Sequence, residues 1–300
     1  MYFKYKNLLQ RLFSNLPKGE LLNYLFQKHI TRTLPPGNEK FLVKVHEAHQ
    51  HYDYFTKYNK LKTKNNKYYE FGAGWNLVVP LSMTYLGFDV FCIDIRRLII
   101  PSLIRDSLEK FEKNREVLPF KLDKITREEI RDGEIMDYLS RTHGINYTAP
   151  ADARSTGFEE NSFDFISSTA TFEHIPKDDI LLILKESYRI LNKGGIISIS
   201  IDYKDHWSYF DRNISIYNFL KYSSKEWKKY NPSLHYQNRL RHSDYLDLIS
   251  KTNFEVVLDA PITPNDEDKK VMKTIQVSEE FQGYNRDELA IRGSEIVLRK

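Results

Sequence analysis

The stretch Tyr68-Tyr69-Glu70-Phe71-Gly72-Ala73-Gly74-Trp75-Asn76 decides the fold of this 300-residue chain. A β-prone run ends there in two glycines that are separated by one residue. A strand that ends in this way can turn tightly into a helix, and a ligand can approach its backbone closely, because glycine carries no Cβ. We therefore expect a ligand-binding loop between a strand and a helix.

Short β-prone runs alternate with helical segments on both sides of this loop. The runs lie at residues 68–71, 90–93, 145–148, 163–167 and 196–201. This alternation is typical of βαβ units and predicts an α/β fold with a mostly parallel sheet. Closer to the C-terminus, residues 243–252 favour a helix, and residues 254–258 and 295–299 favour strands.

One helix is predicted with particular clarity before the fifth run. Ile180, Leu181, Leu184, Tyr188 and Leu191 make one apolar face, and we expect Gly194-Gly195 to end this helix. Two long segments interrupt the alternation, at about residues 96–144 and 205–242. Because segments that leave the carboxyl ends of parallel strands build the binding cleft, both are expected to shape the site.

The N-terminal segment has a different character. Residues 1–40 carry seven basic and two acidic side chains, with apolar residues at near-helical spacing. Two short amphipathic helices are expected there, and a further helix is expected at residues 41–58, before a Lys-rich linker at residues 60–67. We expect residues 1–65 to form a helical cap and residues 66–300 to form the principal domain.

Composition sets further bounds. The formal net charge of +4 comes from 45 basic and 41 acidic residues, which does not indicate a nucleic-acid partner. The single cysteine, Cys92, lies in an apolar run and has no disulfide partner, so a reducing compartment is expected. No run is long and apolar enough to span a bilayer. These features predict a cytoplasmic protein.

Two acidic residues indicate which ligand the loop takes. Glu70 precedes the glycines, and Asn76 stands where a dinucleotide-binding loop usually has its third glycine. A carboxylate there would repel a pyrophosphate but favour a ligand with an ammonium and a sulfonium. Asp94 follows Gly74 by 20 residues and can accept the hydroxyls of a ribose. Nicotinamide and adenosylmethionine cofactors would both use Asp94.

With these residues the sequence resembles the class I S-adenosylmethionine-dependent methyltransferases, over roughly residues 66–202. The resemblance implies S-adenosylmethionine as cofactor and a Rossmann-like, doubly wound, seven-stranded sheet whose last strand is antiparallel, here with helical insertions. It also implies that Asp94 holds the ribose, that Ile95 packs on the adenine and that Asp152 contacts the adenine amino group. The implied cofactor-binding residues are Glu70, Gly72, Ala73, Gly74, Asp94, Ile95, Asp152, Ala153 and Thr169.

Methyl transfer to a hydroxyl requires a base beside the methyl donor. His174 follows the fourth strand and His206 follows the fifth. We favour His206 as the base, because Asp205 or Asp202 beside it would raise its basicity, although a surface histidine in a lid would look similar. The cluster of Asp202, Asp205 and His206 could instead hold a divalent cation, but the spacing is too common to predict a metal.

The acceptor is the least constrained part of the function. The aromatic residues of 205–242 could stack on sugar rings while Arg239 and Arg241 hold phosphates, or these side chains could simply pack on the sheet. The run Ser167-Ser168-Thr169-Ala170 argues against nucleobase amines. We expect O-methylation of a small molecule, or of a sugar in a bacterial surface polysaccharide.

Three alternatives remain open at this point. They are a nicotinamide-dependent reductase, a non-catalytic cofactor-binding or scaffold relative, and a peripheral membrane protein that uses the basic N-terminal helices. Glu70 and the missing third glycine disfavour the reductase. The oligomeric state is not constrained.

Overall fold

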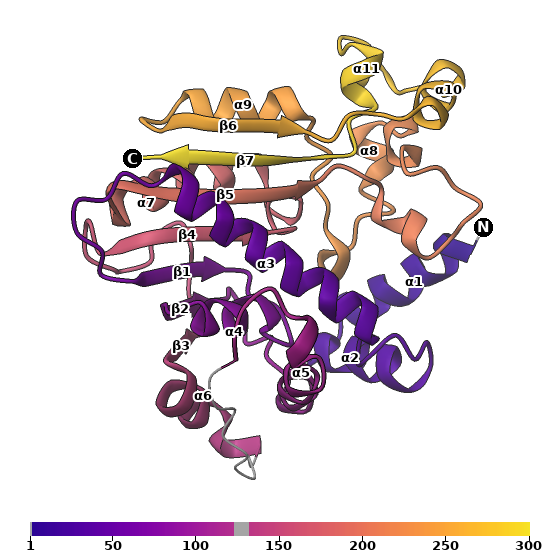
Figure 1. Cartoon of the computed structure of the whole chain (residues 1–300). Helices are drawn as coiled ribbons and strands as arrows, with labels where there is room; N and C mark the ends of the chain where they lie inside the picture. The colour runs from indigo at the N-terminus through magenta and orange to yellow at the C-terminus, as the bar shows by residue number, and fades with distance from the viewer. Residues whose placement is uncertain (1, 123–131) are drawn as a thin grey trace.

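The computed structural model describes residues 2–122 and 132–300. Its centre is a seven-stranded sheet with the order β3-β2-β1-β4-β5-β7-β6 (Figure 1). The strands are β1 (Lys67–Phe71), β2 (Asp89–Ile93), β3 (Ile145–Thr148), β4 (Phe163–Thr169), β5 (Leu191–Asp202), β6 (Glu255–Pro261) and β7 (Gly293–Arg299). Neighbours among β1 to β5 pair in parallel, whereas β7 runs antiparallel between β5 and β6. The predicted α/β sheet with an antiparallel last strand is therefore confirmed.

Helices pack on both faces of this sheet. The helices of the described residues are α1 (Tyr2–Ser14), α2 (Gly19–His29), α3 (Asn38–Tyr58), α4 (Val78–Tyr85), α5 (Pro101–Lys113), α6 (Ile135–His143), α7 (Lys177–Ile190), α8 (Ser224–Trp227), α9 (His242–Ser250), α10 (Asp266–Thr274) and α11 (Arg286–Leu289). Apolar residues of α3 to α6 form one core with the sheet, and those of α7 and α9 form another on its opposite face. Part of the first insertion, residues 123–131, lies outside the described residues. No described helix is both long and apolar enough to cross a membrane.

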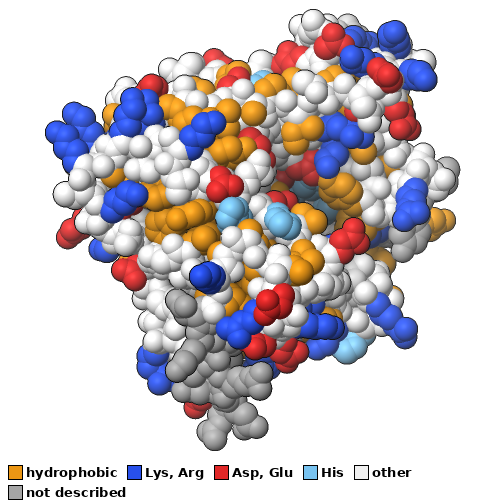
Figure 2. Space-filling view, viewed as in Figure 1, with side chains coloured by type: hydrophobic (Ala, Val, Ile, Leu, Met, Phe, Trp, Pro, Cys, Tyr) orange, Lys and Arg blue, Asp and Glu red, His pale blue; other side chains and the backbone are white. Residues whose placement is uncertain are grey.

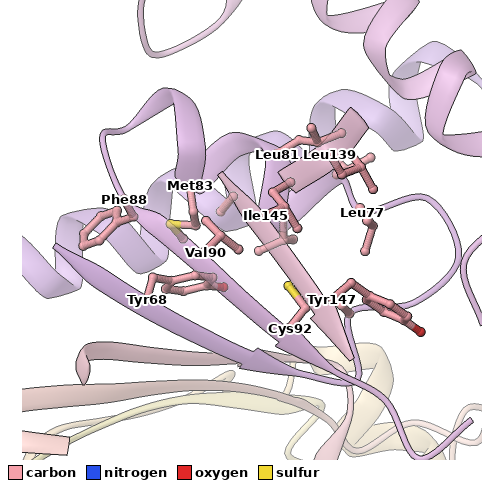
Figure 3. Packing of buried hydrophobic residues seen from close by; sticks show 14 of the residues in the cluster. Tyr68, Leu77, Leu81, Met83, Phe88, Val90, Cys92, Leu139, Ile145 and Tyr147 are labelled. Atoms are coloured by element: carbon pink, nitrogen blue, oxygen red, sulfur yellow. The ribbon is translucent and has the colours of Figure 1, made fainter. Parts of the chain in front are cut away.

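The side-chain alternation of the strands explains why both faces need a cover. Tyr68 of β1 and Val90 of β2 belong to one apolar core, whereas Tyr69 of β1 and Ile93 of β2 belong to the other. Figure 3 shows Cys92 on the first of these faces, below α4. Its side chain is buried, as the sequence predicted.

Helix α3 attaches the N-terminal segment directly to the sheet. His51 is 1% exposed, and its ring nitrogens lie 2.6 Å from Ser198 Oγ and 3.1 Å from Thr169 Oγ1. Burial lowers the pKa of His51 to about 4, so the ring is neutral at pH 7. The helix therefore covers β4 and β5 and reaches them through polar as well as apolar contacts.

One sequence expectation about helix α7 is wrong. The helix ends at Ile190, and Gly194-Gly195 lies inside β5. Gly194 has φ +90°, and a Cβ there would lie 2.5 Å from the carbonyl oxygen of Lys60. The backbone N–H of Lys60 donates to the Gly194 carbonyl at 2.7 Å. These glycines therefore allow the linker before β1 to approach strand β5 closely. In the sequence alone, a glycine pair with this role cannot be told from one that ends a helix.

Candidate active site

A cavity of about 450 Å³ opens at the carboxyl ends of β1 to β4. In the sheet, β2 and β3 follow β1 on one side, whereas β4 and β5 lie on its other side. The strand order therefore reverses between β1 and β4. Ligands of open α/β sheets bind at such a point. The lining residues are Phe71, Gly72, Ile93, Asp94, Ile95, Arg96, Leu98, Ala151, Asp152, Ala153, Arg154, Ala170, Thr171, His174, Ile175, Pro176, Asp179, Ile183, Ser233, Leu234, His235 and Tyr236.

Phe71 and Gly72 of the glycine loop line this cavity, whereas Ala73 and Gly74 are not among its lining residues. Gly72 has φ +73°, and a Cβ at this position would lie 2.6 Å from Thr171 Cγ2, in the loop after β4. Its N–H donates to the Ile93 carbonyl of β2 at 3.0 Å. Gly74 has φ +77°, and a Cβ there would meet no atom within 4 Å, so its requirement for glycine is conformational. The loop thus joins β1, β2 and the segment after β4 at the cavity edge.

Asp94 follows β2 directly and lies at the cavity wall. It is 3% exposed, and its carboxylate accepts a hydrogen bond from the Tyr147 hydroxyl at 2.8 Å. Burial raises the pKa of Asp94 to about 7, against the opposing effect of hydrogen bonds from Tyr147 and from the backbone of Ala73. These contacts hold an acceptor group in the cavity, where it can receive ribose hydroxyls. Sequence reasoning missed Tyr147, because its role depends on β3 lying beside β2.

The remaining predicted adenine-side residues also border the cavity. Ile95 is 63% exposed and presents an apolar surface there, and Ala153 lies nearby. Asp152 lines the cavity, but Arg154 holds both of its oxygens, with Nε at 3.0 Å and Nη2 at 2.6 Å. These hydrogen bonds, the largest cause, lower the pKa of Asp152. An adenine amino group would therefore meet a carboxylate that is already part of an ion pair.

Glu70 and Thr169 lie behind the cavity surface. Glu70 is 3% exposed and accepts a hydrogen bond from the Tyr68 hydroxyl at 3.0 Å. Burial raises its pKa to about 8, which favours the protonated form at pH 7. Thr169 contacts His51 through its hydroxyl. Neither residue is among those that line the cavity, whereas Ala170 and Thr171 are.

The two candidate bases lie side by side. The His174 and His206 ring centroids are 4.9 Å apart, and His174 lines the cavity, whereas His206 does not. His174 Nδ1 lies 2.6 Å from the Tyr236 carbonyl oxygen. This acceptor requires a proton on Nδ1, so the lone pair of the neutral ring is on Nε2. Of the two histidines, His174 is the better placed to meet an acceptor in the cavity.

The structure corrects the predicted partner of His206. The Asp205 carboxylate accepts from the Trp207 N–H at 2.8 Å and from Asn218 Nδ2 at 3.2 Å, and the residue is fully buried. It caps the short helix η4 (His206–Tyr209) and contributes to folding of the loop. Asp202 lies closer to the imidazole, with Oδ2 at 3.5 Å from His206 Nε2. Burial acts to raise the pKa of Asp202, but hydrogen bonding and the nearby positive charges outweigh it and lower the pKa.

Glu173 is a further buried group that sequence reasoning did not select. It is 2% exposed, and burial raises its pKa well above the usual range. Within the described residues, Glu173, His174 and His206 offer ligand atoms that all lie within 4.8 Å of one another. Their oxygen and nitrogen donors could ligate a divalent transition metal. The cation cluster considered from sequence, which included Asp205, is not the one that the fold brings together.

Several aromatic side chains of the second insertion, residues 205–242, pack inside the protein and are not arranged as a lid that could stack on a sugar. Trp207, Tyr217 and Trp227 are buried in a third apolar core with residues from the C-terminal segments. Arg241 is fully buried and donates to the carbonyls of Tyr203, Leu289 and Ile291. Arg239 similarly donates to the Phe219 carbonyl and pairs with Glu280. Of the two alternatives that the sequence left open, packing is the one observed, because the Nη groups of Arg241 donate to backbone carbonyls and Arg239 pairs with a carboxylate.

The insertion nevertheless contributes to the cavity through its short helix η6 (Ser233–His235) and Tyr236. Burial lowers the pKa of His235 to about 3, so this ring is neutral at physiological pH. Its centroid lies 4.2 Å from that of Trp207. No local motif in the sequence marks residues 233–236 as part of the site. They reach the cavity only because their segment, which lies far beyond His174 in the chain, packs against it.

Residues 124–199 match the family model described as a methyltransferase domain. The matched part covers about a quarter of the chain and includes β3, β4 and most of β5, so this part of the chain is similar to methyltransferase domains. The glycine loop and Asp94 lie outside the matched residues.

Several solved structures are similar to this chain. An S-adenosylmethionine-dependent methyltransferase from Methanosarcina mazei is 15% identical over 82% of this chain and 95% of that chain, with a TM-score of 0.43. One from Archaeoglobus fulgidus is 14% identical over 93% and 99%, with a TM-score of 0.45. Geranyl diphosphate C-methyltransferase from Streptomyces coelicolor A3(2) is 11% identical over 89% and 85%, with a TM-score of 0.46. Because these TM-scores are below 0.5, the similarities to these structures do not assign a function to the chain. No similar sequence was found among curated proteins.

Proposed function

We propose that the chain is a class I S-adenosylmethionine-dependent methyltransferase, and that it methylates a hydroxyl of a small molecule or of a sugar in a surface polysaccharide. The observation that carries this proposal is the shared cavity of Gly72, Asp94 and His174, which combines a cofactor edge with a candidate base. Ser233, Tyr236 and Asp179 add polar groups to the same lining, and these fit a hydroxylated acceptor. The cofactor supplies an electrophilic methyl group on its sulfonium.

The protein residues divide the remaining tasks. The Gly72 backbone allows close approach of the methionine part, the Asp94 carboxylate accepts the ribose hydroxyls, and Ile95 offers an apolar surface to the adenine. His174 Nε2 takes the proton of the acceptor hydroxyl while the Tyr236 carbonyl holds its Nδ1–H. We place His206 and Asp202 behind His174. Burial and the neighbouring His206 lower the pKa of His174 to about 4, against the opposing effect of the Tyr236 carbonyl and Asp202, so the ring is neutral at pH 7 and can accept a proton.

Calorimetry tests the cofactor part of this proposal. S-adenosylmethionine or S-adenosylhomocysteine should bind to the purified chain, and NADH should not. Tight binding of NADH together with no binding of either methionine derivative would support the reductase alternative. Cofactor binding without turnover on any acceptor would support a non-catalytic relative.

The acceptor is identified with cofactor that carries a labelled methyl group. Nucleotide sugars, small hydroxylated molecules and lipid-linked glycans are offered in parallel, and label transfer is followed by mass spectrometry. Base-stable, ether-type products would support O-methylation. Label on an amine instead would contradict the proposed chemistry.

A further inference from the structure

Helices α1 and α2 expose several large apolar side chains and bury several polar ones, although Phe3 and Tyr24 are buried. On α1 the buried side chains include Lys6, Asn7 and Gln10, which are 8%, 6% and 6% exposed. The large apolar residues of the two helices and their flanks that are exposed are Tyr5, Leu8, Leu9, Leu12, Leu16, Leu21, Leu25 and Ile30. On α1 these residues recur every three or four positions and so share one face. Single exposed leucines are ordinary, but a continuous stripe indicates a binding surface.

Polar contacts hold α1 in this orientation. Asn7 Nδ2 donates to the Lys229 carbonyl at 2.8 Å, and Gln10 Nε2 donates to Asn23 Oδ1 of α2 at 3.5 Å. The Lys6 ammonium lies over the ring of Phe210. If α1 rotated to bury its leucines, these three polar side chains would lose their contacts. The exposed stripe is therefore a stable feature of the fold.

The surface around this stripe is cationic. Lys4, Arg11, Lys18 and Arg32 are exposed. In residues 1–37 the sequence has six Lys and Arg and a single acidic residue, Glu20, which pairs with Arg96 at 2.6 Å. Figure 1 places both helices at the margin of the molecule, and Figure 2 shows Lys and Arg side chains along that margin.

We propose that α1 and α2 dock onto an anionic lipid membrane. The exposed leucines enter the boundary between headgroups and acyl chains, and the lysines and arginines contact the lipid phosphates. Cationic charge beside an apolar stripe is the combination that such a surface binds. A second copy of this chain is disfavoured as the occupant, because it would bring the same positive charge to the contact.

The short helix η6 lies between the docking surface on α1 and the cavity. The Leu234 N–H of η6 donates to Ser14 Oγ of α1 at 3.4 Å, while Leu234 and His235 line the cavity. Docking therefore brings this wall of the site close to the lipid surface. An acceptor attached to a membrane lipid would reach the cavity without leaving the bilayer.

Vesicle sedimentation with the full chain tests the proposal. The chain should pellet with vesicles that contain phosphatidylglycerol and phosphatidylcholine, much less with phosphatidylcholine alone, and less with both at high salt. The double variant Leu8→Glu/Leu12→Glu should lower the apparent affinity for the mixed vesicles at least about tenfold. Leu182→Glu, which changes an exposed leucine on α7, should leave binding unchanged.

Controls separate this surface from the methyl-transfer chemistry. Circular dichroism and S-adenosylmethionine calorimetry should give the same result for the double variant as for the wild type, since neither leucine lines the cavity. Failure of the wild type to bind anionic vesicles, or equal binding by the double variant, would overturn the proposal. A concentration-dependent dimer in sedimentation velocity that Leu12→Glu dissociates would also overturn it, by identifying a second copy as the occupant.

Discussion

The proposed cofactor side and the proposed acceptor side of the cavity are built in different ways. Gly72 and Asp94 lie close together in the chain and come from adjacent parallel strands joined by one helix. Leu234 and His235 belong to a long insertion and reach the cavity through packing against α1 and Trp207. The cofactor side is thus defined by local turn geometry and strand pairing, whereas the acceptor side is defined by long-range packing. Substitutions on the two sides should have separable effects.

The largest expected effect is on the cofactor side, at Gly72. Gly72→Val places a branched side chain at φ +73° and against Thr171, so S-adenosylmethionine affinity should fall by about a hundredfold or more. Calorimetry measures the loss. Gly283→Ala, at a glycine with no atom near a Cβ, is the matched control and should bind normally. Normal cofactor affinity in Gly72→Val would remove the loop from the site.

The next effect concerns the acceptor side and the base. His174→Ala should lower kcat by about a hundredfold, because the acceptor hydroxyl loses the group that takes its proton, while cofactor affinity changes little. His206→Ala should cause a smaller loss, since His206 lies behind His174. His49→Ala, at a surface histidine paired with Asp53, should retain full turnover. If only His206→Ala lost activity, the base would be His206 instead.

A pH titration of cofactor binding sharpens the role of Asp94. The pKa of this carboxyl is raised to about 7, and only its ionised form accepts two ribose hydroxyls. Affinity for S-adenosylmethionine should therefore weaken as the pH falls from about 8 to 6, by up to about tenfold. In Asp94→Asn this pH dependence should disappear and the affinity should remain low. An unchanged pH profile in the variant would assign the titration to another group.

The smallest expected effect is at Tyr147. Tyr147→Phe removes the hydrogen bond to Asp94 but keeps the ring, so cofactor affinity should fall only about threefold to tenfold. The loss should be smaller in the Asp94→Asn background, because the two residues then no longer form the same hydrogen bond. A double-mutant cycle by calorimetry measures this coupling. Fully additive losses would show that Tyr147 acts independently of Asp94.

Much of the acceptor side could not be predicted, because residue types that are typical of a binding site stabilise the fold there instead. Arg241 could be a phosphate ligand in a Tyr-rich segment, but its two Nη groups donate to three carbonyl oxygens that are far away in the chain. Asp205 could be the partner of His206, but its carboxylate accepts from the N–H of Trp207, two residues further on. The first outcome depends on the tertiary fold, and the second on the local turn.

The sequence by itself determined the alternation of strands and helices, the glycine loop and the acid at the end of β2. These features depend on backbone conformation and on side-chain periodicity, which act over a few residues. Only the tertiary structure decided that His174 rather than His206 lines the cavity, that Asp202 replaces Asp205 beside His206, and that the leucines of α1 face outward. The cavity lining and the outward orientation of the leucines depend on contacts between segments that are far apart in the chain, which no local pattern contains. Asp202 and His206 are only four residues apart, but the conformation of the turn after β5 decides that they meet.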